Sequence, residues 1–283
     1  MTERKNSHSW ALALNAISIA LVAVLATQVF HESCHAIASV LVGARLKWFN
    51  LFAVDHDWVG EMNRWGEIII AGNAPLMNLV TGGMAAALFS RRWVMRRPTL
   101  RLFLLYFGIY SLSTGFGYLI RDALVYQPEG QNLGDLSRVL ELLDETWPVR
   151  ILMGLIGAAG YRWVMLWLAR STLRFGEGMA ERSRRLRLAL SLLMAPYLTI
   201  NVIFTVLSFW HPIGTDGILV TAFQYWIGYS AFLLAFGASY WTEVDTAPPD
   251  ATPLQIRLSW PWAAGAAVAL GVAVAVLLPT VHF

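Results

Sequence analysis

The sequence has few charged residues. They make up 14% of its 283 residues, against roughly a quarter in an average soluble protein, whereas 57% are hydrophobic. One soluble core cannot bury that much apolar surface. Apolar stretches of about 18 or more residues, enough to cross a bilayer, recur along the chain between short charged connections. We therefore expect a multi-pass integral membrane protein with the lipid bilayer as a partner.

Cysteine is almost absent as well. Cys34 is the only one, so no intrachain disulfide can form and cysteine usage does not indicate a redox compartment. The formal net charge is +3, but the basic residues gather in short loops, which favours a role in membrane topology and argues against nucleic acid as a partner. The N-terminus has a basic start and a long apolar run without a small-residue cleavage site, so we expect a retained anchor. A compact chain of this kind suits a prokaryotic plasma (inner) membrane.

The apolar segments predict six to seven transmembrane helices. They lie at about 10–30, continuing as helix to 43, and at 67–90, 100–121, 149–169, 187–210, 218–240 and 260–281. The arginine-rich loops 91–101 and 170–187 should be cytoplasmic by the positive-inside rule. This alternation puts the N-terminus in the cytoplasm and the far end of the first span near the opposite surface.

Two connections have patterns of their own. Residues 46–66 are rich in aromatic and β-branched residues without a helical stripe, which predicts an extended hairpin at the membrane interface. Residues 126–148 contain turn residues and then a periodic run of leucine and valine, which predicts a short amphipathic helix with Asp135 at its start. The expected fold class is an all-α polytopic membrane protein with a small interfacial β-hairpin after the first helix.

The end of the first predicted span carries the run His31-Glu32-Ser33-Cys34-His35. Helical residues four apart lie one turn apart on one face, so His31 and His35 can both offer an imidazole nitrogen to one tetrahedral zinc ion. Glu32 then lies beside the metal, where a carboxylate can act as the general base toward an acidified water. Ionisable residues are costly within a membrane and mark functional sites there, which favours this interpretation over a chance match or a pair of capping histidines.

A catalytic zinc site needs a third protein ligand. Asp135 is the preferred candidate, because it follows a glycine-containing turn and shares the predicted membrane side of the two histidines. Its alternative role is to cap its own helix. The other candidates are Asp55, His56, Asp57, Asp122, Asp144, His211 and Asp216, with His211 and Asp216 next in order.

Three segments carry a resemblance to a known family. The first is Phe30-His31-Glu32-Ser33-Cys34-His35-Ala36, which runs on to Gly43, and the second is Ala71-Gly72-Asn73-Ala74-Pro75-Leu76-Met77-Asn78. They look like the metal-binding helix and the Ala-Gly-Pro-x-x-Asn segment of the site-2 protease family of intramembrane zinc metallopeptidases. The third, Asn132-Leu133-Gly134-Asp135, stands where that family has Leu-Asp-Gly, with the glycine here before the aspartate. The resemblance covers residues 20–145, about half the chain.

The resemblance implies that the two histidines and Asp135 bind Zn²⁺ and that Glu32 is the general base. It further implies that Asn73 and Asn78 bind substrate, although polar contacts between helices are an alternative role for both asparagines. The implied activity is that of a zinc metalloendopeptidase. Its substrate would be a membrane protein or peptide, cleaved in or near a transmembrane segment, with the aromatic hairpin holding it in extended form.

We expect residues 1–148 to form the catalytic membrane core and 149–283 to form additional transmembrane helices of unknown role. A metal- or proton-handling transporter is the second function class. It predicts ionisable residues at the centres of the later spans, which contain almost none. A catalytically inactive scaffold is the third class, and Glu32 argues against it because a structural zinc site needs no general base.

Overall fold

The computed structural model describes residues 3–128, 134–144, 147–176, 181–241 and 258–283. Seven helical segments within these ranges are long and apolar enough to cross a membrane. They are Trp10–Leu41 within α1 (Glu3–Leu41), α2 (Arg64–Phe89), α4 (Pro98–Val125), α6 (Trp147–Leu173), Arg182–Trp210, Thr215–Trp241 and Trp260–Leu277. The expected all-α polytopic class is confirmed, and each predicted span matches one of these helices.

The last three spans are composite. The fifth contains α7 (Arg182–Ala189), the π-helix η1 (Leu190–Met194), α8 (Ala195–Leu207) and the 3₁₀ turn η2 (Ser208–Trp210). The sixth contains α9 (Thr215–Phe223), the π-helix η3 (Gln224–Gly228) and α10 (Ala231–Trp241), and the seventh contains α11 (Trp260–Val272) and the π-helix η4 (Ala273–Leu277). Short helices α3 (Arg92–Met95) and α5 (Asp135–Leu142) lie between spans. A π-helical turn changes the direction in which later side chains point and often marks a functional site.

The predicted hairpin is confirmed. Strand β1 (Ala44–Phe49) pairs in antiparallel fashion with β2 (Val54–Trp58). It follows α1 directly, because Gly43 adopts a positive φ of 88° that ends the helix and lets the chain change direction. A third strand, β3 (Val281–His282), pairs with the other edge of β1. The sequence did not indicate this strand, since the last predicted span runs to residue 281 and two residues are too few to carry a β pattern.

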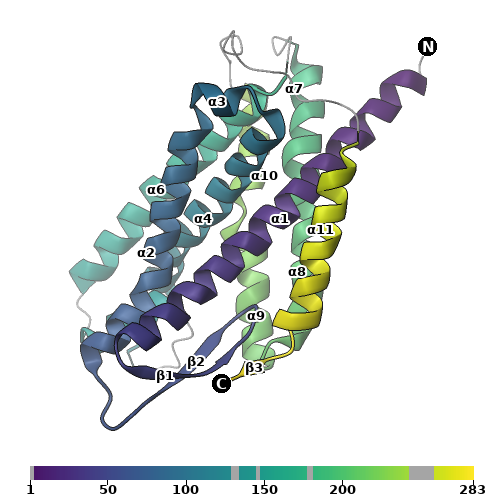
Figure 1. Cartoon of the computed structure of the whole chain (residues 1–283). Helices are drawn as coiled ribbons and strands as arrows, with labels where there is room; N and C mark the ends of the chain where they lie inside the picture. Colours follow the sequence, from purple (N-terminus) through teal and green to yellow (C-terminus); the bar gives the residue numbers. More distant parts are fainter. Residues whose placement is uncertain (1–2, 129–133, 145–146, 177–180, 242–257) are drawn as a thin grey trace.

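Helix α1 runs through the bundle and packs against α2, α4, α8 and α11. Figure 1 shows α3 and α7 at the end of the bundle that holds the N-terminus, and the three-stranded sheet at the end that holds the C-terminus. The arginine-rich segment 91–101 therefore lies at the end opposite the sheet and the C-terminal end of α1. Cytoplasmic placement of that arginine-rich end stays a prediction.

Large apolar side chains cover the outside of the bundle. On α6 and α11, for example, Leu155 is 65% exposed and Val268 is 66% exposed. Such faces need lipid contact, which agrees with a multi-pass membrane protein. One main hydrophobic core lies inside and draws on residues from both the 1–148 and 149–283 parts, including Tyr106 and Phe232. The sequence also predicts a short polar loop at 241–259 between the last two spans, and this loop falls largely outside the described residues.

Candidate metal centre

The histidine pair lies near the C-terminal end of α1. His31 and His35 are one helical turn apart and are both buried, at 3% and 9% exposure. Their Nε2 atoms are 3.3 Å apart. The i, i+4 spacing therefore brings the two nitrogens to one point, as expected from the sequence.

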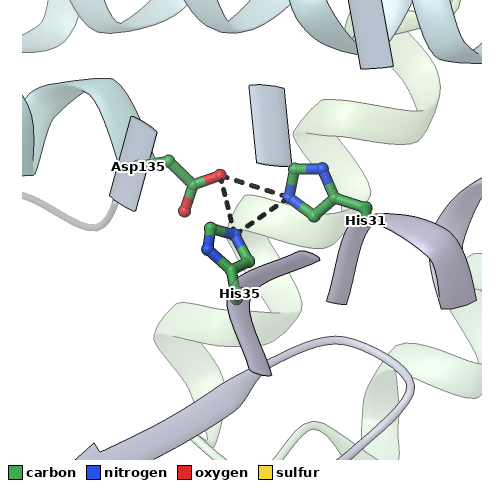
Figure 2. A group of neighbouring side chains, drawn as sticks. All are labelled: His31, His35 and Asp135. Atoms are coloured by element: carbon green, nitrogen blue, oxygen red, sulfur yellow. Dashed lines mark hydrogen bonds and ion pairs between the residues drawn. The ribbon is translucent and has the colours of Figure 1, made fainter. Parts of the chain in front are cut away.

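Asp135 joins the pair from the first turn of α5. Its Oδ2 lies 3.2 Å from His31 Nε2 and 3.4 Å from His35 Nε2. Figure 2 shows the carboxylate of Asp135, from α5, and the two imidazole rings, from α1, pointing toward one another. These three residues form the one group of possible metal ligands found among the described residues. The preferred third ligand therefore lies beside the histidines, 104 positions away in the sequence from His31.

The position of Asp135 depends on Asp122, near the end of α4. Asp122 Oδ2 accepts hydrogen bonds from the backbone N–H groups of Leu136 and Ser137, at 2.9 and 3.0 Å, and so caps α5 from outside. Arg121 Nε donates to its other oxygen at 2.6 Å. The residue at the cap position is Gly134, without a side-chain cap of its own. Asp135 is therefore not the cap of its helix, and its carboxylate is available to the histidines.

The three atoms fit a tetrahedral ion. Zinc bonds to nitrogen and oxygen are about 2.0–2.1 Å long, so two ligand atoms at tetrahedral angles lie about 3.3–3.4 Å apart. The observed separations are 3.2, 3.3 and 3.4 Å. Two imidazoles and one carboxylate are also the donor types that zinc and similar transition metals accept, whereas calcium and magnesium prefer oxygen alone. This buried group could hold a metal ion.

The hydrogen bonds behind the rings favour metal binding through Nε2. His35 Nδ1 lies 2.8 Å from the carbonyl oxygen of Ile70, which can only accept, so the ring hydrogen is on Nδ1 and the lone pair on Nε2. His31 Nδ1 lies 2.9 Å from the amide of Asn78, whose buried Oδ1 has no hydrogen-bond partner. A half-turn of that amide would let Oδ1 accept the Nδ1 hydrogen that metal binding at Nε2 requires.

Glu32 is buried beside the histidines, at 4% exposure. Its Oε1 accepts a hydrogen bond from Gln28 Nε2 at 2.9 Å, one turn earlier on α1. Gln28 Oε1 in turn accepts from the hydroxyl of Tyr225, in η3, at 3.2 Å. The ring of Tyr118, on α4, stacks on that of His31 with centroids 5.5 Å apart. Residues from three spans therefore hold the carboxylate and the first imidazole.

A cavity of about 480 Å³ opens over this group. Its walls include Glu32, both histidines and Asp135, together with residues of β2, α2, α9 and η3. Of the other candidate ligands, Asp55, His56 and His211 line the cavity. None of them belongs to the three-residue group, and His56 Nε2 is instead 2.9 Å from Glu67 Oε2.

Asp135 and His211 line the cavity outside the spans, and both have shifted pKa values. Burial opposes ionisation of Asp135, but the charge of His35 and the hydrogen bonds to both imidazoles outweigh it and lower the pKa of Asp135. The carboxylate is therefore ionised at neutral pH, as a ligand must be. Burial lowers the pKa of His211 to about 4, so this imidazole is neutral at the cavity wall.

The two asparagines have partners within the protein. Asn78 contacts His31, while Asn73 Nδ2 donates to the backbone carbonyl of Cys34 at 3.0 Å. Substrate binding by these residues stays a prediction. The residues that sequence reasoning did not place at the site are Gln28, Tyr118 and Tyr225, which belong to no motif in the sequence. Of the third resembling segment, residues 132 and 133 lie outside the described part of the chain.

No protein-family model, curated protein or solved structure matches this chain.

Proposed function

We propose that this protein is a zinc metallopeptidase of the membrane that hydrolyses a peptide bond in or near a transmembrane segment, in the manner of the site-2 protease family. The observation that carries the proposal is the triangle of His31 Nε2, His35 Nε2 and Asp135 Oδ2, with separations of 3.2–3.4 Å. Glu32 lies in the same cavity. Its presence favours a hydrolytic site over a structural metal site.

His31, His35 and Asp135 would hold the ion and leave a fourth tetrahedral position open. When bound, zinc supplies Lewis acidity, which polarises a peptide carbonyl and makes water a better nucleophile at neutral pH. Asn78 and the Ile70 carbonyl fix the ring orientations, so little reorganisation is needed when the site is loaded.

Glu32 is the proposed general base. Gln28 occupies Oε1, which leaves Oε2 to take a proton from the attacking water and pass it to the leaving amine. Residues of α9 and η3 line the cavity together with those of α2, and this shielding strengthens each electrostatic interaction inside. The later spans thus supply a wall of the proposed active site.

Strand β2 is the proposed guide for the substrate. It is an edge strand of the sheet, and its residues Val54, Asp55 and His56 line the cavity. An extended peptide can add to such an edge through main-chain hydrogen bonds, which places a backbone carbonyl rather than a side chain near the ion. We place this activity in a prokaryotic plasma membrane.

Metal content tests the first half of the proposal. The detergent-purified protein, His35→Ala and Asp135→Ala are compared by mass spectrometry, with His56→Ala as the matched control, because His56 lines the same cavity outside the triangle. We expect about one zinc per chain in the natural protein and the control, and loss in both ligand variants. Absence of zinc from the natural chain, or equal loss in the control, would contradict the site.

Cleavage tests the second half. Zinc-loaded natural protein and Glu32→Gln are incubated in proteoliposomes with a set of single-span membrane peptides, and the products are identified by mass spectrometry. We expect cuts in or near the membrane segment by the natural protein, at least 100-fold slower in Glu32→Gln, which keeps its zinc. Retained zinc with no cleavage of any peptide would favour the scaffold, and zinc flux into the vesicles would favour the transporter.

A further inference from the structure

Strands β1 and β2 are joined by a tight turn that forms part of the cavity wall. Five consecutive residues, Phe52 to His56, line the cavity over the candidate metal centre. The backbone N–H of Asn50 donates to the carbonyl of Ala53 at 2.9 Å. Its side-chain Oδ1 accepts from the N–H of Phe52 at 3.0 Å. One asparagine therefore closes the turn with both its backbone and its side chain.

The same asparagine attaches the turn to the end of the seventh span. Asn50 Nδ2 donates to the carbonyl of Leu278 at 2.7 Å, and the N–H of Leu51 donates to the carbonyl of Leu277 at 2.9 Å. Leu277 is the last residue of η4, where carbonyl groups have no partner within the helix. Asn50 and Leu51 are both 0% exposed. The turn therefore satisfies the end of this helix through two buried hydrogen bonds.

Strand β3 makes a second attachment, at the edge of β1 that faces away from β2. The N–H of Phe283 donates to the carbonyl of Lys47 at 2.9 Å. Lys47 is the extra residue of a β-bulge, since the pairing of β1 with β2 shifts register between Leu46 and Trp48. The outer strands of the sheet are then β2 and the two-residue β3. Of these two, only β2 is long enough to pair with an extended peptide.

We propose that Asn50 is a positioning residue, which holds the β1–β2 hairpin at a fixed place over the candidate metal centre by attaching it to the seventh span. This inference rests on the proposed peptidase function, in which a peptide adds to β2. Asn50 lies outside the cavity lining, so it acts through the hairpin and leaves the metal ligands and Glu32 untouched.

The expected effect of losing Asn50 is on substrate binding. Main-chain hydrogen bonds between a peptide and β2 are the same in the ground state and in the transition state. Loosening the strand that makes them therefore raises KM and leaves kcat unchanged. A general loss of structure would instead lower the zinc content and the unfolding temperature.

Asn50→Ala is compared with the natural protein in proteoliposomes, with single-span membrane peptides as the probe. Asn15→Ala is the matched control, because Asn15 is a buried asparagine at the other end of the same span, where its Oδ1 accepts from the N–H of Ser259 at 2.7 Å. Each protein is assayed for zinc per chain and for the KM and kcat of cleavage. Deuterium exchange at the backbone amides of residues 44–58 is measured without any peptide.

We expect Asn50→Ala to raise KM about 10-fold at unchanged kcat and zinc content, and to speed exchange in the hairpin about 10-fold. Asn15→Ala should change neither. Phe283→Pro removes one hydrogen bond of β3 at an exposed position and should shift both quantities in the same direction, which keeps the test valid if Asn50→Ala does not fold.

Unchanged exchange in the hairpin, an unchanged KM, or an equal effect in Asn15→Ala would overturn the proposal. Failure of the peptidase function is read separately, as absence of cleavage by the natural protein. The attachment of the hairpin is then still decided by the exchange rates, which need no substrate.

Discussion

Gly134→Ala should weaken metal binding although residue 134 is not a ligand. Its backbone has φ −111° and ψ 145°, which alanine also adopts, so the substitution causes no backbone strain. The added Cβ, however, would lie 2.5 and 2.6 Å from the carboxylate oxygens of Asp122 and 2.5 Å from Arg121 Nη2. These are side-chain ends that can move, but moving Asp122 breaks the two backbone hydrogen bonds that cap α5.

The magnitude follows from that cap. Loss of a helix cap costs about 1 kcal/mol, and loss of a group that orients a ligand typically lowers metal affinity about 10–100-fold. Because Asp135 is the first residue of α5, we expect the zinc dissociation constant of Gly134→Ala to rise by about that factor, equivalent to about 1.4–2.7 kcal/mol. The assay is competition with a chelating dye in detergent.

Gly72→Ala is the matched control. Gly72 lies in α2 and faces α5, but its added Cβ would be 3.6 Å from Val139 Cγ2, an ordinary contact. Alanine is also the better helix former by about 1 kcal/mol, so this variant should keep its zinc affinity and gain slightly in stability. An unchanged dissociation constant for Gly134→Ala, or an equal rise in Gly72→Ala, would refute the reasoning.

Three further predictions follow from single contacts. Asn78→Ala removes the partner of the His31 imidazole, a proposed metal ligand, and should raise the zinc dissociation constant about 10–100-fold, whereas Asn73→Ala should lower the unfolding temperature without this effect; dye competition and thermal unfolding separate the two. Gln28→Leu removes the hydrogen bond that orients the Glu32 carboxylate and should slow cleavage about 10-fold at unchanged zinc content. A normal cleavage rate in this variant would count against the proposed role of Gln28 in orienting Glu32. Burial lowers the pKa of His211 to about 4 from its ordinary 6.5, so the unfolded chain binds more protons between these values and stability falls as pH falls through them. Thermal unfolding at pH 7 and pH 5 should therefore show a smaller pH effect in His211→Phe than in the natural protein.

The fold was predictable where local patterns are strong. The seven spans follow from apolar length, and the hairpin follows from its β-branched and aromatic residues. The strand Val281–His282 was not predictable, because it forms through pairing with Trp48 and Phe49, far away in the sequence. The π-helical turns were not predictable either, since no local signal distinguishes η3 from the α-helix on either side.

The histidine pair of the site was predictable from the sequence, whereas the third member of the group was only one of several candidates. The spacing of His31 and His35 on one helix is a local property, whereas the third ligand depends on a long-range contact. Asp122 and Asp135 were both candidates from the sequence, since each is a carboxylate near a predicted helix end. The structure separates them, because Asp122 caps α5 and Asp135 contacts the histidines.

The role of residues 149–283 could not be predicted, because they contain almost no ionisable groups in their spans. Their contribution is made by neutral side chains. Tyr225 donates to Gln28 and Gln224 accepts from Tyr118, so η3 contacts the side chains that adjoin the proposed base, Glu32, and the proposed metal ligand, His31. Whether the chain divides functionally at residue 148 stays a prediction, but these hydrogen bonds cross that boundary.

The most direct test of the central claim is zinc K-edge X-ray absorption of the purified protein loaded with one equivalent of zinc. The account predicts a four-coordinate ion with nitrogen and oxygen ligands at about 2.0 Å and the multiple scattering of two imidazoles. Asp135→Ala should change this spectrum. A sulfur ligand at about 2.3 Å, which Cys34, the one cysteine of the sequence, could supply, or a spectrum without imidazole scattering, would contradict the assignment of His31, His35 and Asp135.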